Sequence, residues 1–289
     1  MNMKYILGVI VLLLILAGAW WLMNMSNDQT AVDETPTVLP VEPDGGIGNG
    51  AEPLEEPDAV MERGPETVIG SSVNGTDITA YHFGTGAKEI LLVGNLHGGD
   101  APNTEKLAEE FITYFKENPD AVPAGVTVTV IPSLNPDGLA NNSRFNANKV
   151  DLNRNFACDW AATSMWRNQE VSGGSAAFSE PEAKAVRDYI ADHQITAAIV
   201  WFAAEGKVYP SACDTTPSTD SVTLAATFAT AAGYPSAAEF DAYQINGDMV
   251  NWFAQMKIPA ISVLLTDRTN TEWSKNEKGI AAVLKAYAE

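Results

Sequence analysis

The hydrophobic positions of the chain form short continuous runs from residue 67 onward, and these runs predict strands. Apolar stretches without a helical period are typical of strands that are buried on both faces. Four segments have this composition: 89–96, 126–131, 195–202 and 261–265. A further pair, 67–73 and 77–83, flanks Asn74-Gly75, a dipeptide that favours a tight hairpin turn.

Helical patterns lie between these strands. They cover residues 103–116, 179–193, 224–232, 247–256 and 271–288. Asn103 or Thr104 is expected to cap the first helix, and Ser179 the second, with Pro181 at its first position. Because strands alternate with helices, the pattern predicts a single α/β domain with a twisted, mostly parallel sheet covered by helices on both faces.

The first 24 residues follow a different pattern, with a continuous apolar run at 6–23. This run just reaches the length needed to cross a bilayer, and Trp20 and Trp21 lie where an interfacial aromatic belt is expected. One interpretation is therefore a retained membrane anchor. The other is a cleaved signal peptide, because Ala17-Gly18-Ala19 offers a small-residue cleavage site.

Residues 25–66 predict a linker, because acidic residues, Pro and Gly dominate and no apolar period is present. Such a segment cannot bury enough surface to order itself, and its repelling charges favour an extended chain. The folded domain is then expected at 67–289. Both interpretations of the first segment place this domain outside the cytoplasm, anchored at the cell surface or in the periplasm, or secreted after cleavage.

The overall charge narrows the range of partners. With 17 Lys and Arg against 37 Asp and Glu, the formal net charge is -20. This balance argues against nucleic acid or an anionic membrane surface as a partner, because both are themselves negative.

The chain contains two cysteines, Cys158 and Cys213. Outside the cytoplasm an even pair is most simply one disulfide. Two buried free thiols are the alternative. A metal role is not expected, because zinc sites built on Cys normally have more sulfur nearby.

The segment 135–156 combines turn-forming residues with groups that suit an anion. It follows the apolar run at 126–131, has no helical period, and is predicted to be a long ordered loop. Arg144, Arg154 and the amide of Asn153 lie within it and together make a good carboxylate receptor. In the alternative interpretation this is a solvated loop whose arginines pair with its own acids, Asp137 and Asp151.

The same loop resembles the substrate-binding loop of the zinc carboxypeptidase family. The likeness is carried by Asn-Pro-Asp-Gly at 135–138, then an Arg, then Val-Asp-Leu-Asn-Arg-Asn-Phe at 150–156. It implies a mixed sheet of about eight strands between helices, with the site at the strand ends. It also implies roles for five residues in polarising the scissile carbonyl, gripping the terminal carboxylate, contacting the substrate and lining the side-chain pocket: Arg144, Asn153, Arg154, Tyr243 and Val250.

The resemblance implies a zinc ion as well, but the residues that would hold and use it are incomplete. The expected His-x-x-Glu turn reads His97-Gly98-Gly99-Asp100. It retains two potential zinc ligands, the imidazole of His97 and the shorter carboxylate of Asp100. Ala203 stands where the third ligand, a His, is expected, and Leu264 where the family has its general base. Neither side chain can bind metal or accept a proton, so the sequence argues against zinc binding and hydrolysis.

Few residues could replace the missing zinc ligand and general base. His82 falls in the predicted hairpin and His193 at a helix end, whereas Glu205 and Asp267 lie close in sequence to the two lost positions. Three hypotheses follow. The first is a non-hydrolytic domain that binds peptide C-termini or peptidoglycan stem peptides. The second is an active metallocarboxypeptidase with a rearranged site that uses His97, Asp100 and Glu205. The third is a structural or partner-binding domain with no ligand in the groove.

Overall fold

The computed structural model describes residues 64–213, 216–240, 243 and 245–289. The described residues belong to one compact unit, Val60–Glu289. The predicted membrane segment and nearly all of the predicted linker lie outside these residues. Within the described part, no helix combines the length and the hydrophobicity that a membrane span requires.

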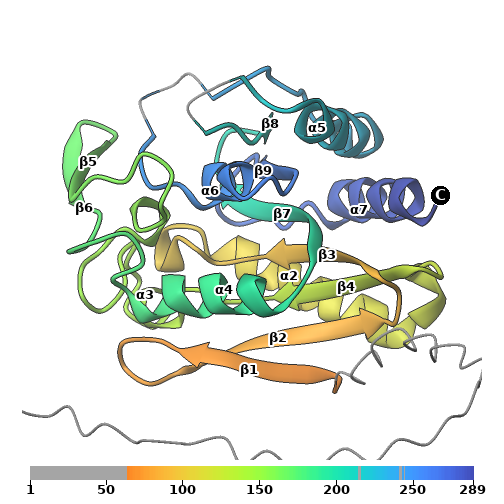
Figure 1. The fold of residues 1–289 in the computed structure, drawn as a ribbon, viewed down its shortest axis with the longest axis horizontal. Helices are drawn as coiled ribbons and strands as arrows, with labels where there is room; N and C mark the ends of the chain where they lie inside the picture. Colours follow the sequence, from red (N-terminus) through yellow and green to blue (C-terminus); the bar gives the residue numbers. More distant parts are fainter. Residues whose placement is uncertain (1–63, 214–215, 241–242, 244) are drawn as a thin grey trace, which may run out of the picture. The chain divides into compact units, whose positions relative to one another are not determined.

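The main sheet contains seven strands in the order β1-β2-β4-β3-β7-β9-β8 (Figure 1). They are β1 (Glu66–Ser71), β2 (Asp77–Gly84), β3 (Lys88–Val93), β4 (Val126–Ile131), β7 (Ile195–Ala203), β8 (Lys207–Pro210) and β9 (Ala260–Leu265). Strands β4, β3, β7 and β9 are parallel to one another, and the outer strands pair antiparallel. The predicted mixed, mostly parallel sheet is confirmed, with seven described strands in place of about eight.

Two short strands lie outside this sheet and were not predicted. β5 (Thr163–Trp166) and β6 (Gln169–Ser172) form a separate antiparallel hairpin. Its turn residues, Arg167 and Asn168, have φ values of 52° and 71°. Positive φ at both central residues is what a tight hairpin turn of this kind requires.

Helices cover both faces of the sheet because its strands are apolar on both sides. They are α2 (Pro102–Glu117), α3 (Pro136–Ala140), α4 (Pro181–Asp192), α5 (Thr219–Ala232), α6 (Met249–Gln255) and α7 (Trp273–Ala288). One core cluster joins β3 residues such as Ile90 and Leu92 to α2, α5 and α7. The other joins Leu91 and Val93 to α4 and α6, so α4 and α2 lie on opposite faces (Figure 1).

The helix starts differ from the predicted caps. The N-cap of α2 is Ala101, and neither Asn103 nor Thr104 caps it. The amide of Asn103 instead donates to the backbone oxygens of Asp267 and Asn270, at 2.8 and 2.9 Å. The prediction for Asn103 was wrong because its side chain forms hydrogen bonds to a distant part of the chain instead of capping the helix.

The second predicted cap is also displaced. Pro181 does open α4, but its N-cap is Glu180 and not Ser179. The Ser179 hydroxyl donates to the Glu180 carboxylate at 2.8 Å, one residue before the helix.

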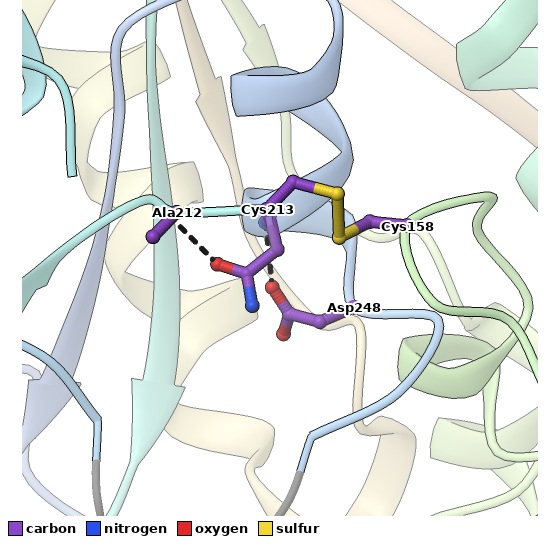
Figure 2. The surroundings of a disulfide bond; sticks show 5 residues. Cys158, Ala212, Cys213 and Asp248 are labelled. Carbon is purple, nitrogen blue, oxygen red and sulfur yellow. Dashed lines mark hydrogen bonds between the residues drawn. A yellow bond between two sulfur atoms is a disulfide. The ribbon is translucent and has the colours of Figure 1, made fainter. Parts of the chain in front are cut away.

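The predicted disulfide is confirmed, because Cys158 and Cys213 are bonded to each other (Figure 2). Cys158 lies just after the loop 135–156, and Cys213 follows β8. The bridge therefore ties the end of this loop to the segment beyond the edge strand of the sheet. The alternative of two free thiols is excluded.

Candidate functional site

Three neighbouring parallel strands, β3, β7 and β9, end at the same edge of the sheet. His97 follows the first, Ala203 ends the second, and Leu264 lies on the third, where it pairs with Phe202. The loop after β4 adds Arg144 and Asn153. A cavity of about 370 Å³ opens at this edge, and all these residues line it. The sheet topology alone therefore collects residues that are far apart in the sequence.

Arg144 is the most highly connected side chain of the cavity. Its Nε donates to Asp151 at 2.9 Å, and its Nη2 lies 2.8 Å from His97 Nε2. A third contact is an ion pair of 3.5 Å between Nη1 and Asp100, and the guanidinium lies over the ring of Trp166 at 4.5 Å. Arg144 and Asp151 are both buried. The alternative interpretation was therefore right about the pairing of Arg144 with Asp151, but this pair is buried and not solvated, and Asp137 binds Ser72 and not an arginine.

The contact with Arg144 determines the form of His97. A guanidinium only donates hydrogen bonds, so Nε2 of His97 accepts and the ring proton lies on Nδ1. Nδ1 has no hydrogen-bond partner among the described residues. Burial, followed by the charges of Arg144, Arg154 and Arg268, lowers the pKa of His97 well below its usual value. His97 is therefore a neutral imidazole held by an arginine.

The residues present do not fit a zinc ion. Zinc in this arrangement requires three protein ligands. His97 and Asp100 each face a guanidinium, because Arg144 contacts both and Arg268 Nε lies 3.4 Å from Asp100 Oδ1. Ala203 supplies no third donor. No group of three or more His, Cys, Asp or Glu side chains in the described ranges could hold a metal ion.

The two suggested replacement residues are engaged elsewhere. Glu205 lines the cavity, but its Oε1 accepts from Tyr209 at 2.7 Å and from Lys207 at 3.1 Å. The Asp267 carboxylate accepts from Thr269 and Asn270 in the turn after β9. It is partly exposed, and those hydrogen bonds lower its pKa. Both carboxylates are therefore hydrogen-bonded within their own segments of the chain.

The remaining histidines lie away from this cavity. His82 on β2 contacts the hydroxyls of Thr129 and Thr67, each at 3.1 Å. His193, after α4, lies 2.6 Å from the backbone oxygen of Tyr189. Both are structural residues, as the sequence predicted.

The predicted carboxylate receptor is filled by the protein's own groups. Arg154 is only 1% exposed and is not among the residues that line the cavity. Its Nη1 donates to the backbone oxygen of Asn153 at 2.7 Å, and its Nη2 to that of Met165 at 3.5 Å. The amide of Asn153 donates to the Asp248 carboxylate at 2.7 Å. An external carboxylate at this point would have to displace Asp248.

Asp248 is a site residue that the sequence reasoning missed. It is the N-cap of α6, where its Oδ1 accepts from the backbone N–H of Asn251 at 2.8 Å. Figure 2 shows it close to the disulfide between Cys158 and Cys213. Burial raises the pKa of Asp248, although the hydrogen bonds from Asn251 and Asn153 act in the opposite direction. The signal in the sequence was an Asp directly before a helical segment.

Tyr243 and Val250, expected to contact substrate, have different environments. Tyr243 lines the cavity, its ring lies 5.8 Å from the Arg154 guanidinium, and it packs edge-on against Phe240. Val250, on α6, is buried in the hydrophobic core of the domain and does not line the cavity. Asp248 and Asn251 form that part of the wall instead.

Comparisons with known proteins agree with this fold. The model of the family described as zinc carboxypeptidase matches residues 58–286. Carboxypeptidase SOL1 of Arabidopsis thaliana is 31% identical over 141 residues, which cover 45% of this chain and 27% of that protein. The chain thus matches about a quarter of the length of this relative.

Solved structures share the fold at low sequence identity. Murein-tripeptide amidase MpaA from Escherichia coli O157 superposes with a TM-score of 0.59 at 18% identity, covering 81% of this chain and 97% of that one. Carboxypeptidase A from Helicoverpa armigera superposes with a TM-score of 0.63 at 18% identity, covering 77% and 68%.

Proposed function

The chain belongs to the zinc carboxypeptidase family, and we propose that its domain binds ligands with a free carboxylate and does not hydrolyse them. The observation that carries the proposal is that Ala203 and Leu264, which line the cavity on β7 and β9, offer neither a metal ligand nor a base. Arg144 Nη2 also lies 2.8 Å from His97 Nε2, so one of the two ring nitrogens is occupied, whereas Nδ1 has no hydrogen-bond partner among the described residues. With Ala203 and Leu264 in the neighbouring positions, a hydrolytic water has neither a Lewis acid nor a base. Loss of such a base alone typically lowers the rate by about 10²–10⁴.

The chemical class of ligand follows from the cavity wall. Arg144, Arg167 and Arg268 line it together with the aromatic rings of Trp166 and Tyr243. Guanidinium forks suit a carboxylate, and the rings suit the apolar parts of a short peptide. Peptide C-termini and peptidoglycan stem peptides both have these features. The name of one fold neighbour, a murein-tripeptide amidase, supports the second source.

An extracytoplasmic location is part of the proposal. It is supported by the Cys158–Cys213 disulfide, because such bonds persist in oxidising compartments. The apolar run at 6–23 would act as the anchor or as a signal segment.

The test has two parts, both with the purified full chain. Metal analysis measures zinc per chain, and calorimetry compares a peptide acid with the corresponding peptide amide. We expect substoichiometric zinc, binding of the acid alone, and no release of C-terminal residues. One firmly held zinc per chain with trimming of peptide ends would overturn the proposal in favour of an active carboxypeptidase. If none of the peptide acids binds, the result would favour a structural domain.

A further inference from the structure

Two of the arginines in or beside the cavity, Arg144 and Arg154, already have hydrogen-bond partners, and a third, Arg167, lies over the ring of Trp166 at 5.0 Å. Arg144 is bound to Asp151, His97 and Asp100 and lies over Trp166. Arg154 is buried behind the wall, and its terminal nitrogens donate to backbone oxygens. A new carboxylate gains little from either guanidinium, because it would first have to displace these partners.

Arg268 differs from both. It follows β9, lines the cavity, and has a side chain that is 33% exposed. Asp100 is its ion-pair partner, at 3.4 Å from Nε, but this approach is not a hydrogen bond. Within the described ranges, the guanidinium of Arg268 donates no hydrogen bond at all. It therefore presents unused donors to the cavity.

The surroundings of Arg268 strengthen its attraction for an anion. Its partner Asp100 is shared with Arg144, which also pairs with the buried Asp151. Phe202 and Leu264 contribute apolar lining to the same cavity and lower the local dielectric. A carboxylate that enters here meets a guanidinium with free donors.

We propose that Arg268 is the anion-binding residue of this cavity, and that a ligand carboxylate pairs with Arg268 and not with the Asn153–Arg154 pair. This inference rests on the proposed function and specifies how the ligand is held. The two N–H donors at the fork of a guanidinium match the two oxygens of a carboxylate. In effect, an arginine of the chain takes the place of the metal as the cation that the ligand meets. The carboxylate can come from a chain terminus or from an acidic side chain.

The experiment measures binding to the full chain by calorimetry. The probes are acetyl-Ala-Ala-Ala as the free acid, the same peptide as the amide, and acetyl-Ala-Glu-Ala amide. The variants are Arg268→Gln, Arg268→Lys and the control Arg187→Gln, whose side chain is exposed on α4 and paired with Asp188. The two acid-bearing probes distinguish a terminal carboxylate from a side-chain carboxylate.

We expect Arg268→Gln to weaken binding of the carboxylate probe by roughly tenfold to a hundredfold, because hydrogen bonds to charged groups contribute in that range. Arg268→Lys should retain part of the affinity, since it keeps the charge without the fork. Arg187→Gln should bind as the parent chain does. Unchanged affinity in Arg268→Gln would overturn this inference and leave the proposed function standing. If no carboxylate probe binds the parent chain, both fall.

Discussion

The buried ion pair between Arg144 and Asp151 provides the sharpest test of how the site is held together. The perturbation is Arg144→Ala. The Arg144 side chain is 4% exposed and that of Asp151 is fully buried, with 2.9 Å between Nε and Oδ2. Removing the arginine leaves the Asp151 carboxylate charged, buried and without its cation. Truncating one partner of such a pair typically costs about 3–5 kcal/mol.

Two further contacts act in the same direction. The variant also loses the stacking of the guanidinium on Trp166 and the hydrogen bond to His97. Because domains of this kind have an unfolding free energy of about 5–15 kcal/mol, the expected loss is a large share of the total. We therefore expect Arg144→Ala to lower the unfolding free energy by an amount near the upper end of about 3–5 kcal/mol.

The assay is urea denaturation of the full chain with the disulfide intact, followed by tryptophan fluorescence. The matched control is Arg187→Ala, which also breaks an arginine–aspartate pair. The Arg187 and Asp188 side chains are 44% and 61% exposed, so this pair should contribute no more than about 1 kcal/mol. A loss in Arg144→Ala no larger than that of the control would refute the reasoning.

Three other predictions concern the described domain. Replacing Cys158 and Cys213 together by Ala should lower the unfolding free energy by about 4 kcal/mol, as expected for a bridge of sequence separation 55; equal stability of this variant and the parent in denaturation would contradict it. Burial raises the pKa of Asp248 above 3.8, so the folded state binds that proton more tightly, and stability falls as pH rises through the raised pKa. Asp248→Asn should lack this fall in denaturation curves collected across the acidic range, and parallel pH profiles would disprove the assignment. Gly279→Ala should destabilise by about 1–3 kcal/mol in thermal or urea denaturation, because the added Cβ would lie 2.6 Å from the Phe228 ring. An exposed helix glycine would instead gain about 1 kcal/mol from the same change, and a gain here would show that α5 and α7 can separate.

The strands that the sequence predicted well share one property. β3, β4, β7 and β9 are continuous apolar runs, and each coincides with its predicted segment to within a few residues at either end. They are buried between two layers of helices, so the composition itself records their position. β8 and the β5–β6 hairpin were missed because they are four residues long and mix polar with apolar side chains.

Some chemical limits of the candidate site follow from residue identity alone. That Ala203 and Leu264 cannot bind metal or accept a proton is a property of the side chains and needs no coordinates. The long loop motif at 135–156 likewise indicated the family, and two cysteines indicated a disulfide. These conclusions depend on residue identity and order along the chain, which the amino-acid sequence contains in full.

The sequence could not determine which donor is free and which is occupied. Asn153 and Asp248 are 95 residues apart and meet only because the loop after β4 packs against α6. Arg268 faces Asp100 only because β9 and β3 end at the same edge of the sheet. Hydrogen-bond partners across such distances follow from sheet order and packing, which no local pattern encodes. The tertiary structure alone decided that Arg154 is covered and that Arg268 is open to a ligand.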